Sequence, residues 1–190
     1  MESLIVSTVT VALAEIGDKT QLLALVLAAR FRKPWPIIAG ILLATLVNHA
    51  IAAEVGAWLA RLLSPDVLRW IVAASFLAMG LWALIPDKDS GAAAKYQFGA
   101  FLTTLIAFFL VEIGDKTQIA TVVLAAKYAN VFMVVVGTTL GMLLANVPVV
   151  LAGHFAAEKL PLRAIRIVTA LLFIALGVAA FLGGGMTLEG

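Results

Sequence analysis

The sequence predicts an all-α integral membrane protein with six transmembrane helices arranged as two inverted three-helix repeats. Three observations support this prediction. The chain has 190 residues, of which 63% are hydrophobic and 13% are charged, and its mean hydropathy is +1.10. Its long apolar runs alternate with short charged breaks. A string of seven residues, Glu15 to Gln21, recurs unchanged as Glu112 to Gln118.

Six apolar runs are long enough to cross a bilayer, which takes roughly 20 mostly apolar residues in a helix. They lie at about residues 4–28, 35–60, 67–86, 98–126, 131–156 and 163–183. Prolines precede the second, third and sixth runs, where a helix can begin without losing a hydrogen bond. The chain starts without the basic segment of a secretory signal peptide, so the first run is expected to be a retained helix.

The second half of the chain repeats the first with an offset of 97 residues, the distance from Glu15 to Glu112. We therefore expect a first repeat at 1–86, a linker at 87–97 and a second repeat at 98–190. Because each repeat has an odd number of spans, the second enters the membrane from the opposite side. Inverted repeats of this kind are typical of secondary transporters, whose substrate site lies near the bilayer midplane.

The basic residues outside the motif indicate an orientation. Eight Lys and Arg fall in or beside the loops on one side of the predicted membrane, and three fall on the other. The positive-inside rule then places the linker in the cytoplasm and both termini outside. These residues are dispersed, which argues against nucleic acid as a partner, and the chain has no cysteine for thiolate chemistry.

The repeated motif carries the chemistry, because charged side chains inside a membrane are costly and mark functional sites by default. On a helix, Glu15, Asp18 and Gln21 share one face, and Lys19 can pair with Glu15 four residues before it. Gly17 permits either a close helix approach or a local break. The predicted metal ligands are Glu15, Asp18, Gln21, Glu112, Asp115 and Gln118. The predicted supporting or counter-charged residues are Lys19, Thr20, Lys116 and Thr117.

A site made from both motif copies has oxygen ligands only, which suits Mg²⁺, Ca²⁺ or Mn²⁺ rather than copper or structural zinc. Each copy has two acids and one lysine, so together they carry a charge of −2 that one divalent cation neutralises. Competition between that cation and protons is the simplest form of antiport. The plainer interpretation, acids and lysines that merely bridge helices, is harder to maintain for two identical copies.

Other polar residues in the predicted spans are weaker candidates for the pathway. They are Asn48, His49, Glu54 and Asn146. Asn48 and His49 could line the pathway, but interhelical hydrogen bonding is the favoured explanation for them. Glu54 aligns with Leu151 and so breaks the repeat symmetry, and it is either a proton relay or an interfacial residue.

The doubled Glu-x-Gly-Asp-Lys-Thr motif, in a chain with two three-helix halves, resembles the Golgi-type Ca²⁺/Mn²⁺:H⁺ exchanger family. The resemblance covers nearly the whole chain and is closest to the prokaryotic manganese exporters. It implies that Glu15, Asp18, Glu112 and Asp115 bind and move the cation. It also implies a multi-pass protein of the bacterial inner membrane, with Mn²⁺ or Ca²⁺ as transported substrate and no cofactor.

We therefore predict a secondary transporter that exports divalent cations, chiefly Mn²⁺, from the cytoplasm by H⁺ antiport. The partners are the metal ion, protons and the lipid bilayer, and a homodimer is left open. The main alternative is an exporter of small organic solutes of the amino-acid type, in which the lysines bind a substrate carboxylate. An intramembrane enzyme ranks lower, since the chain lacks a paired-histidine motif and a convincing Ser–His pair. A purely structural subunit would tolerate neutralised motif acids.

Overall fold

The structure is a computed structural model that describes residues 1–85, 98–152 and 162–182. Within these residues every regular element is helical, as the sequence predicts. The predicted linker at 87–97 lies outside the described residues.

The described helices fall into two sets that repeat each other. The first half holds α1 (Glu2–Glu15), α2 (Lys19–Phe31), α3 (Pro34–Leu62) and α4 (Pro65–Ala83). The second half holds α6 (Gly99–Glu112), α7 (Lys116–Lys127), α8 (Val131–Ala152) and α10 (Leu162–Leu182). Each helix of the second half begins 97 residues after its counterpart. The duplicated sequence therefore gives duplicated secondary structure.

The prediction of one continuous helix was wrong for two of the apolar runs, because each is interrupted inside the motif. The run at 4–28 is divided into α1 and α2, and the run at 98–126 into α6 and α7. Each break contains a glycine with a positive φ, 82° at Gly17 and 77° at Gly114. Glycine adopts this conformation without the steric cost that a Cβ would bring. Both glycines therefore lie at a local break in the helix.

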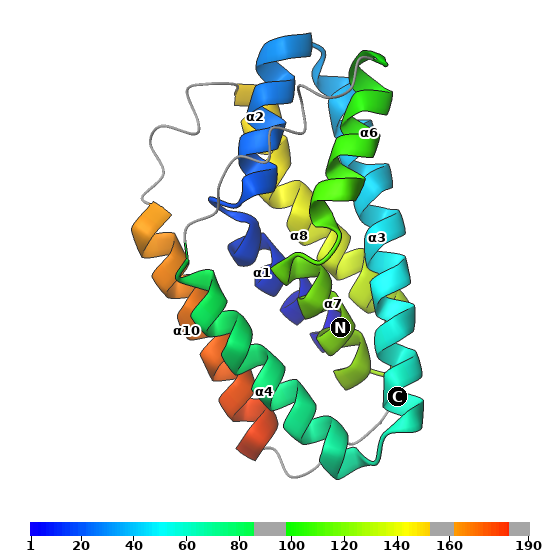
Figure 1. Cartoon of the computed structure of the whole chain (residues 1–190), viewed down its shortest axis with the longest axis vertical. Helices are drawn as coiled ribbons and strands as arrows, with labels where there is room; N and C mark the ends of the chain where they lie inside the picture. Colours follow the sequence, from blue (N-terminus) through cyan, green and yellow to red (C-terminus); the bar gives the residue numbers. More distant parts are fainter. Residues whose placement is uncertain (86–97, 153–161, 183–190) are drawn as a thin grey trace.

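The two interrupted helices run in opposite directions through the molecule. In Figure 1 the chain rises through α1 and α2, whereas it descends through α6 and α7. The most extensive helix packing is between the two halves: α1 packs on α8, α3 packs on α6 and α7, and α4 packs on α10. The two breaks are thereby brought together in the middle of the bundle.

Contacts between the halves are reciprocal in detail. A Cβ added at Gly40 would lie 2.9 Å from the carbonyl oxygen of Phe101, and one added at Gly137 would lie 2.7 Å from that of Leu4. Residue 101 is the repeat equivalent of residue 4, and 137 is that of 40. Glycine at both positions lets α3 approach α6, and α8 approach α1, to near backbone contact.

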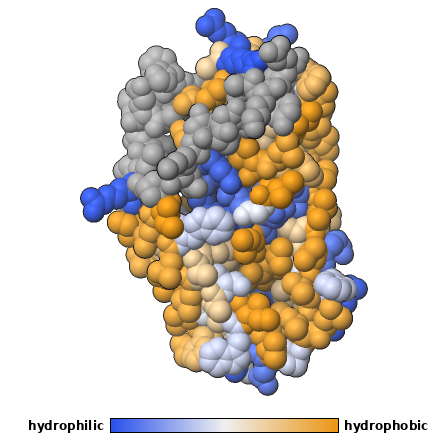
Figure 2. All heavy atoms as spheres, viewed as in Figure 1, coloured by the Kyte–Doolittle hydropathy of each residue, from blue (hydrophilic) through white to orange (hydrophobic). Residues whose placement is uncertain are grey.

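The exterior is that of a membrane protein. Three of the described helices, α3, α4 and α8, are long and apolar enough to cross a bilayer by length and composition. Large hydrophobic side chains remain exposed along them, as at Leu81 and Leu144. Figure 2 shows hydrophobic residues over most of one face, with hydrophilic ones near its ends and in a patch at mid-height. A surface of this kind is matched to lipid rather than to water.

Candidate metal-binding site

At each helix break, the glutamine of the same motif accepts a hydrogen bond from the backbone of the glycine. The Gly17 N–H donates to Gln21 Oε1 at 2.9 Å, and the Gly114 N–H donates to Gln118 Oε1 at 2.6 Å. The amide nitrogen of Gln21 donates to the carbonyl of Ala145 on α8 at 3.0 Å. The sequence predicts both glutamines as metal ligands, but here their oxygens accept hydrogen bonds from the glycine amides.

The breaks also place helix termini beside the motif acids. Asp18 is the N-cap of α2 and Asp115 is the N-cap of α7, both with extended backbone. The N-terminus of a helix carries a partial positive charge and unpaired N–H groups, which stabilise nearby carboxylates. A continuous helix through the motif would have offered neither. The interruption therefore reduces the cost of burying acids within the bundle.

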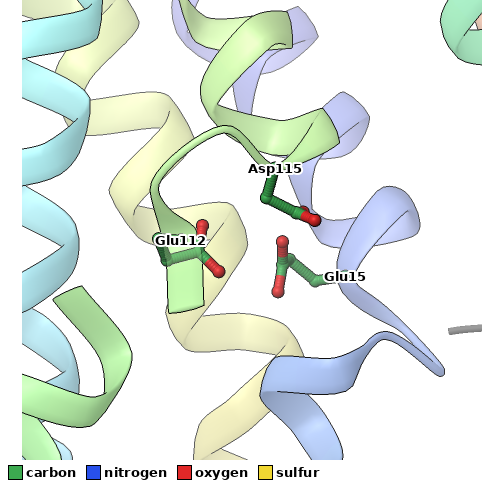
Figure 3. A group of neighbouring side chains, drawn as sticks. All are labelled: Glu15, Glu112 and Asp115. Carbon is green, nitrogen blue, oxygen red and sulfur yellow. The ribbon is translucent and has the colours of Figure 1, made fainter. Parts of the chain in front are cut away.

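Three motif carboxylates converge between the halves. Glu15, Glu112 and Asp115 offer oxygen atoms that lie within 4.8 Å of one another, and all three residues are buried. Figure 3 shows them pointing toward a common space, Glu15 from the end of α1, Glu112 from the end of α6 and Asp115 from the start of α7. Three acids this close require a positive charge or bound protons to offset their mutual repulsion.

Each of these carboxylates is satisfied through one oxygen. Thr20 Oγ1 donates to Glu15 Oε2 at 2.5 Å, and Thr117 Oγ1 donates to Glu112 Oε2 at 3.0 Å. Each threonine thus donates a hydrogen bond to the glutamate of its own motif. The other oxygens, Glu15 Oε1, Glu112 Oε1 and Asp115 Oδ2, are buried and have no hydrogen-bond partner within the described part of the chain.

The two lysines pair across the halves rather than within their own motif. Lys19 Nζ lies 2.6 Å from Asp115 Oδ1, and Lys116 forms an ion pair with Asp18. The predicted pairing of Lys19 with Glu15 was wrong, because the break at the intervening glycine removes the helical geometry that would place them together. The acids and lysines therefore join the two repeats as well as lining the site.

The weaker pathway candidates divide into buried and exposed residues. Asn48 Nδ2 donates to the carbonyl of Phe109 at 3.0 Å, one turn before α6 ends. His49 is fully buried, and neither ring nitrogen has a hydrogen-bond partner among the described residues. Asn146, its repeat equivalent, is also buried and donates within its own helix. Glu54 is exposed on α3 and is not one of the three converging carboxylates.

Comparison with known proteins follows the same division into halves. The family model for the divalent cation/proton antiporter GDT1 matches residues 3–91 and again residues 100–187. The chain belongs to this family. It is therefore a transporter rather than an enzyme, and its metal is a transported substrate rather than a cofactor.

Relatives from bacteria and plants match over most of their length. A Vibrio cholerae protein named "Putative manganese exporter" is 59% identical over 180 residues, covering 94% of this chain and 90% of that protein. "GDT1-like protein 4" of Arabidopsis thaliana is 28% identical over 210 residues, covering 89% and 90%. "GDT1-like protein 3" of Oryza sativa subsp. japonica is 27% identical over 207 residues, covering 95% and 74%. No solved structure matches the chain.

Proposed function

We propose that this protein exports Mn²⁺ from the cytoplasm in exchange for protons, with Ca²⁺ as a second substrate. The site is formed by four acids, Glu15, Asp18, Glu112 and Asp115. The ion first binds the three whose oxygens already lie close together, Glu15, Glu112 and Asp115. The observation that carries the proposal is the set of three buried carboxylate oxygens without a hydrogen-bond partner among the described residues. A buried oxygen of this kind is costly unless an ion or a proton occupies it during function.

The nature of the donors supports a hard divalent cation. Carboxylate oxygens suit Mn²⁺, Ca²⁺ and Mg²⁺, and the site has no thiolate ligand because the chain has no cysteine. The preference for Mn²⁺ and the direction of transport rest on the name of the Vibrio cholerae relative. Family membership supports the coupling to protons.

Proton coupling follows from competition at the same atoms. A carboxylate must be deprotonated to bind a metal ion, so metal binding releases protons and proton binding releases metal. Glu15 and Glu112 suit this exchange because each has a threonine on one oxygen and leaves the other available. An exchanger of this design needs no separate proton site.

The proposed architecture is two inverted repeats with six membrane crossings. In this arrangement α1 with α2, and α6 with α7, each make one interrupted crossing, and the four long helices make the others. Support comes from the opposite course of the interrupted helices and from the reciprocal glycine contacts and ion pairs. Interrupted helices that meet at a midplane site are a recurring feature of secondary transporters. With the eight-to-three excess of basic residues in or beside the loops on one side, both termini face outside.

The rival function, export of an organic solute, is less well supported. Such a site would use a lysine to bind the substrate's carboxylate. Here both motif lysines are engaged with motif aspartates. A solute carboxylate would have to take the place of a motif aspartate as the partner of a lysine, whereas a metal ion binds the carboxylate oxygens themselves.

Mn²⁺ binding to the purified protein tests the proposal. Calorimetric titration at pH 8 and pH 6 should give one Mn²⁺ per chain, with weaker binding at pH 6 because protons compete for the carboxylates. The heat should also vary with the ionisation enthalpy of the buffer, since binding releases protons. Glu54→Gln, which removes an exposed carboxylate outside the site, should bind as the unaltered protein does. Absence of Mn²⁺ binding at both pH 8 and pH 6 would refute the proposal. An Mn²⁺ affinity that does not change with pH would refute the proton exchange.

A further inference from the structure

The two motif lysines occupy equivalent positions in the repeats but have different surroundings. The Lys19 side chain is 22% exposed, whereas that of Lys116 is 4% exposed. Their aspartate partners are both almost fully buried. Lys19 thus reaches the surface of the bundle through a flexible four-carbon stem, and Lys116 is enclosed by the bundle.

The aspartates with which these lysines pair are also inequivalent. Asp115, the partner of Lys19, belongs to the group of three carboxylates whose oxygens lie within 4.8 Å of one another. Asp18, the partner of Lys116, lies outside that group. The repeat symmetry is therefore broken at the candidate site itself. The more exposed lysine is therefore the one whose ammonium contacts a member of the three-carboxylate group.

We propose that Lys19 is a tethered competitor of the transported ion: it pairs with Asp115 in the metal-free state and withdraws when the metal binds. The inference rests on the proposed function. A divalent cation held by Glu15, Glu112 and Asp115 would face the Lys19 ammonium across a single carboxylate, and the two positive charges repel each other in a poorly screened interior. Lys19 can relieve the repulsion by moving toward the surface of the bundle, where its side chain is already partly exposed.

Lys116 has a different role in this scheme. Its ammonium is buried and paired with Asp18, so moving it would break a buried ion pair, which is costly. It is a fixed link between the repeats. Return of Lys19 to Asp115 then helps expel the metal on the release side, and keeps Asp115 compensated afterwards. Lys19 of the first motif copy is thus the movable counter-charge, whereas Lys116 of the second copy holds the two halves together.

The absence of native cysteine makes a chemical test direct. Lys19→Cys and its repeat match Lys116→Cys are purified, and Mn²⁺ affinity is measured by titration. Lys19→Cys should bind Mn²⁺ about tenfold more tightly than the unaltered protein, since a competing charge is gone. Treatment with 2-aminoethyl methanethiosulfonate, which restores an ammonium group at residue 19, should return the affinity toward its original value. Methyl methanethiosulfonate, which adds no charge, should not. Lys116→Cys should lose Mn²⁺ binding or fail to fold.

The outcomes separate this inference from the function beneath it. Failure of the unaltered protein to bind Mn²⁺ would overturn the proposed function and this inference with it. If the unaltered protein binds but Lys19→Cys binds equally or more weakly, Lys19 is not a competitor and the inference is wrong. Failure of Lys19→Cys to fold would overturn it too, because a side chain that withdraws in every cycle cannot be required for folding. Lys19→Arg, which keeps the charge, should retain the original affinity.

Discussion

Replacement of Glu112 by glutamine is expected to reduce Mn²⁺ affinity by about a hundredfold or more and to abolish transport. The substitution keeps the size of the side chain but removes a negative charge from the three-carboxylate group. Affinity for hard divalent cations depends strongly on the number of charged oxygen ligands. Glu15→Gln should have the same effect, because Glu15 has the same threonine contact and the same unpartnered oxygen. Titration with Mn²⁺ and vesicle flux measure the two losses.

Two further variants serve as controls for the Mn²⁺ titration, one with a smaller expected loss of affinity and one with none. Thr117→Val removes the hydroxyl that holds Glu112 and should weaken Mn²⁺ binding by about ten- to a hundredfold, as loss of a supporting hydrogen bond does at metal sites. Glu54→Gln makes the same chemical change as Glu112→Gln on an exposed face and should have no effect. Full Mn²⁺ binding by Glu112→Gln would show that the three carboxylates are structural.

Asp18→Asn is expected to destabilise the fold by about 3–5 kcal/mol, the usual result of removing one partner of a buried ion pair. The Lys116 ammonium, 4% exposed, would lose its paired carboxylate. Because that pair joins α2 to α7, the loss should also weaken the contact between the repeats. Thermal unfolding of the detergent-purified protein, followed by circular dichroism, measures the change.

A matched surface variant calibrates the unfolding experiment. Asp66 lies 3.8 Å from Arg69 and its side chain is 88% exposed, so Asp66→Asn should change stability by less than about 0.5 kcal/mol. The double variant Asp18→Asn with Lys116→Met should recover much of the loss, because it removes both charges of the buried pair. An Asp18→Asn protein that unfolds at the temperature of the unaltered protein would contradict the account of this pair.

Sequence patterns predicted the helical class because apolar runs of membrane-spanning length leave few alternatives. They also indicated which residues matter, since a motif repeated at a fixed offset is visible without a structure. The offset of 97 residues carried over to every helix start in the described part of the chain. Hydropathy, however, does not identify the interruption at Gly17, because apolar residues flank the short polar motif on both sides and the whole run has the length of one span.

The arrangement of the motif side chains could not be predicted, and the helix break is the reason. Spacing rules for a continuous helix pair Lys19 with Glu15, but the positive φ at Gly17 turns the chain between them. The actual partner, Asp115, comes from the other half of the sequence. The glutamines were predicted as ligands for the same reason, whereas Gln21 accepts a hydrogen bond from the freed glycine amide. Pairing across repeats is a tertiary property that no local pattern contains.

Mn²⁺ flux in proteoliposomes under an imposed pH gradient tests the central claim most directly. Purified protein is reconstituted, and Mn²⁺ entry is followed with a trapped metal-sensitive dye beside a parallel pH dye. An acidic lumen should accelerate Mn²⁺ entry, and Mn²⁺ entry should drive protons out; Ca²⁺ should be transported more slowly. Vesicles with Glu112→Gln should show neither flux. Absence of Mn²⁺ flux under every gradient, or flux unaffected by pH and unaccompanied by proton movement, would contradict the assignment of a manganese/proton exchanger.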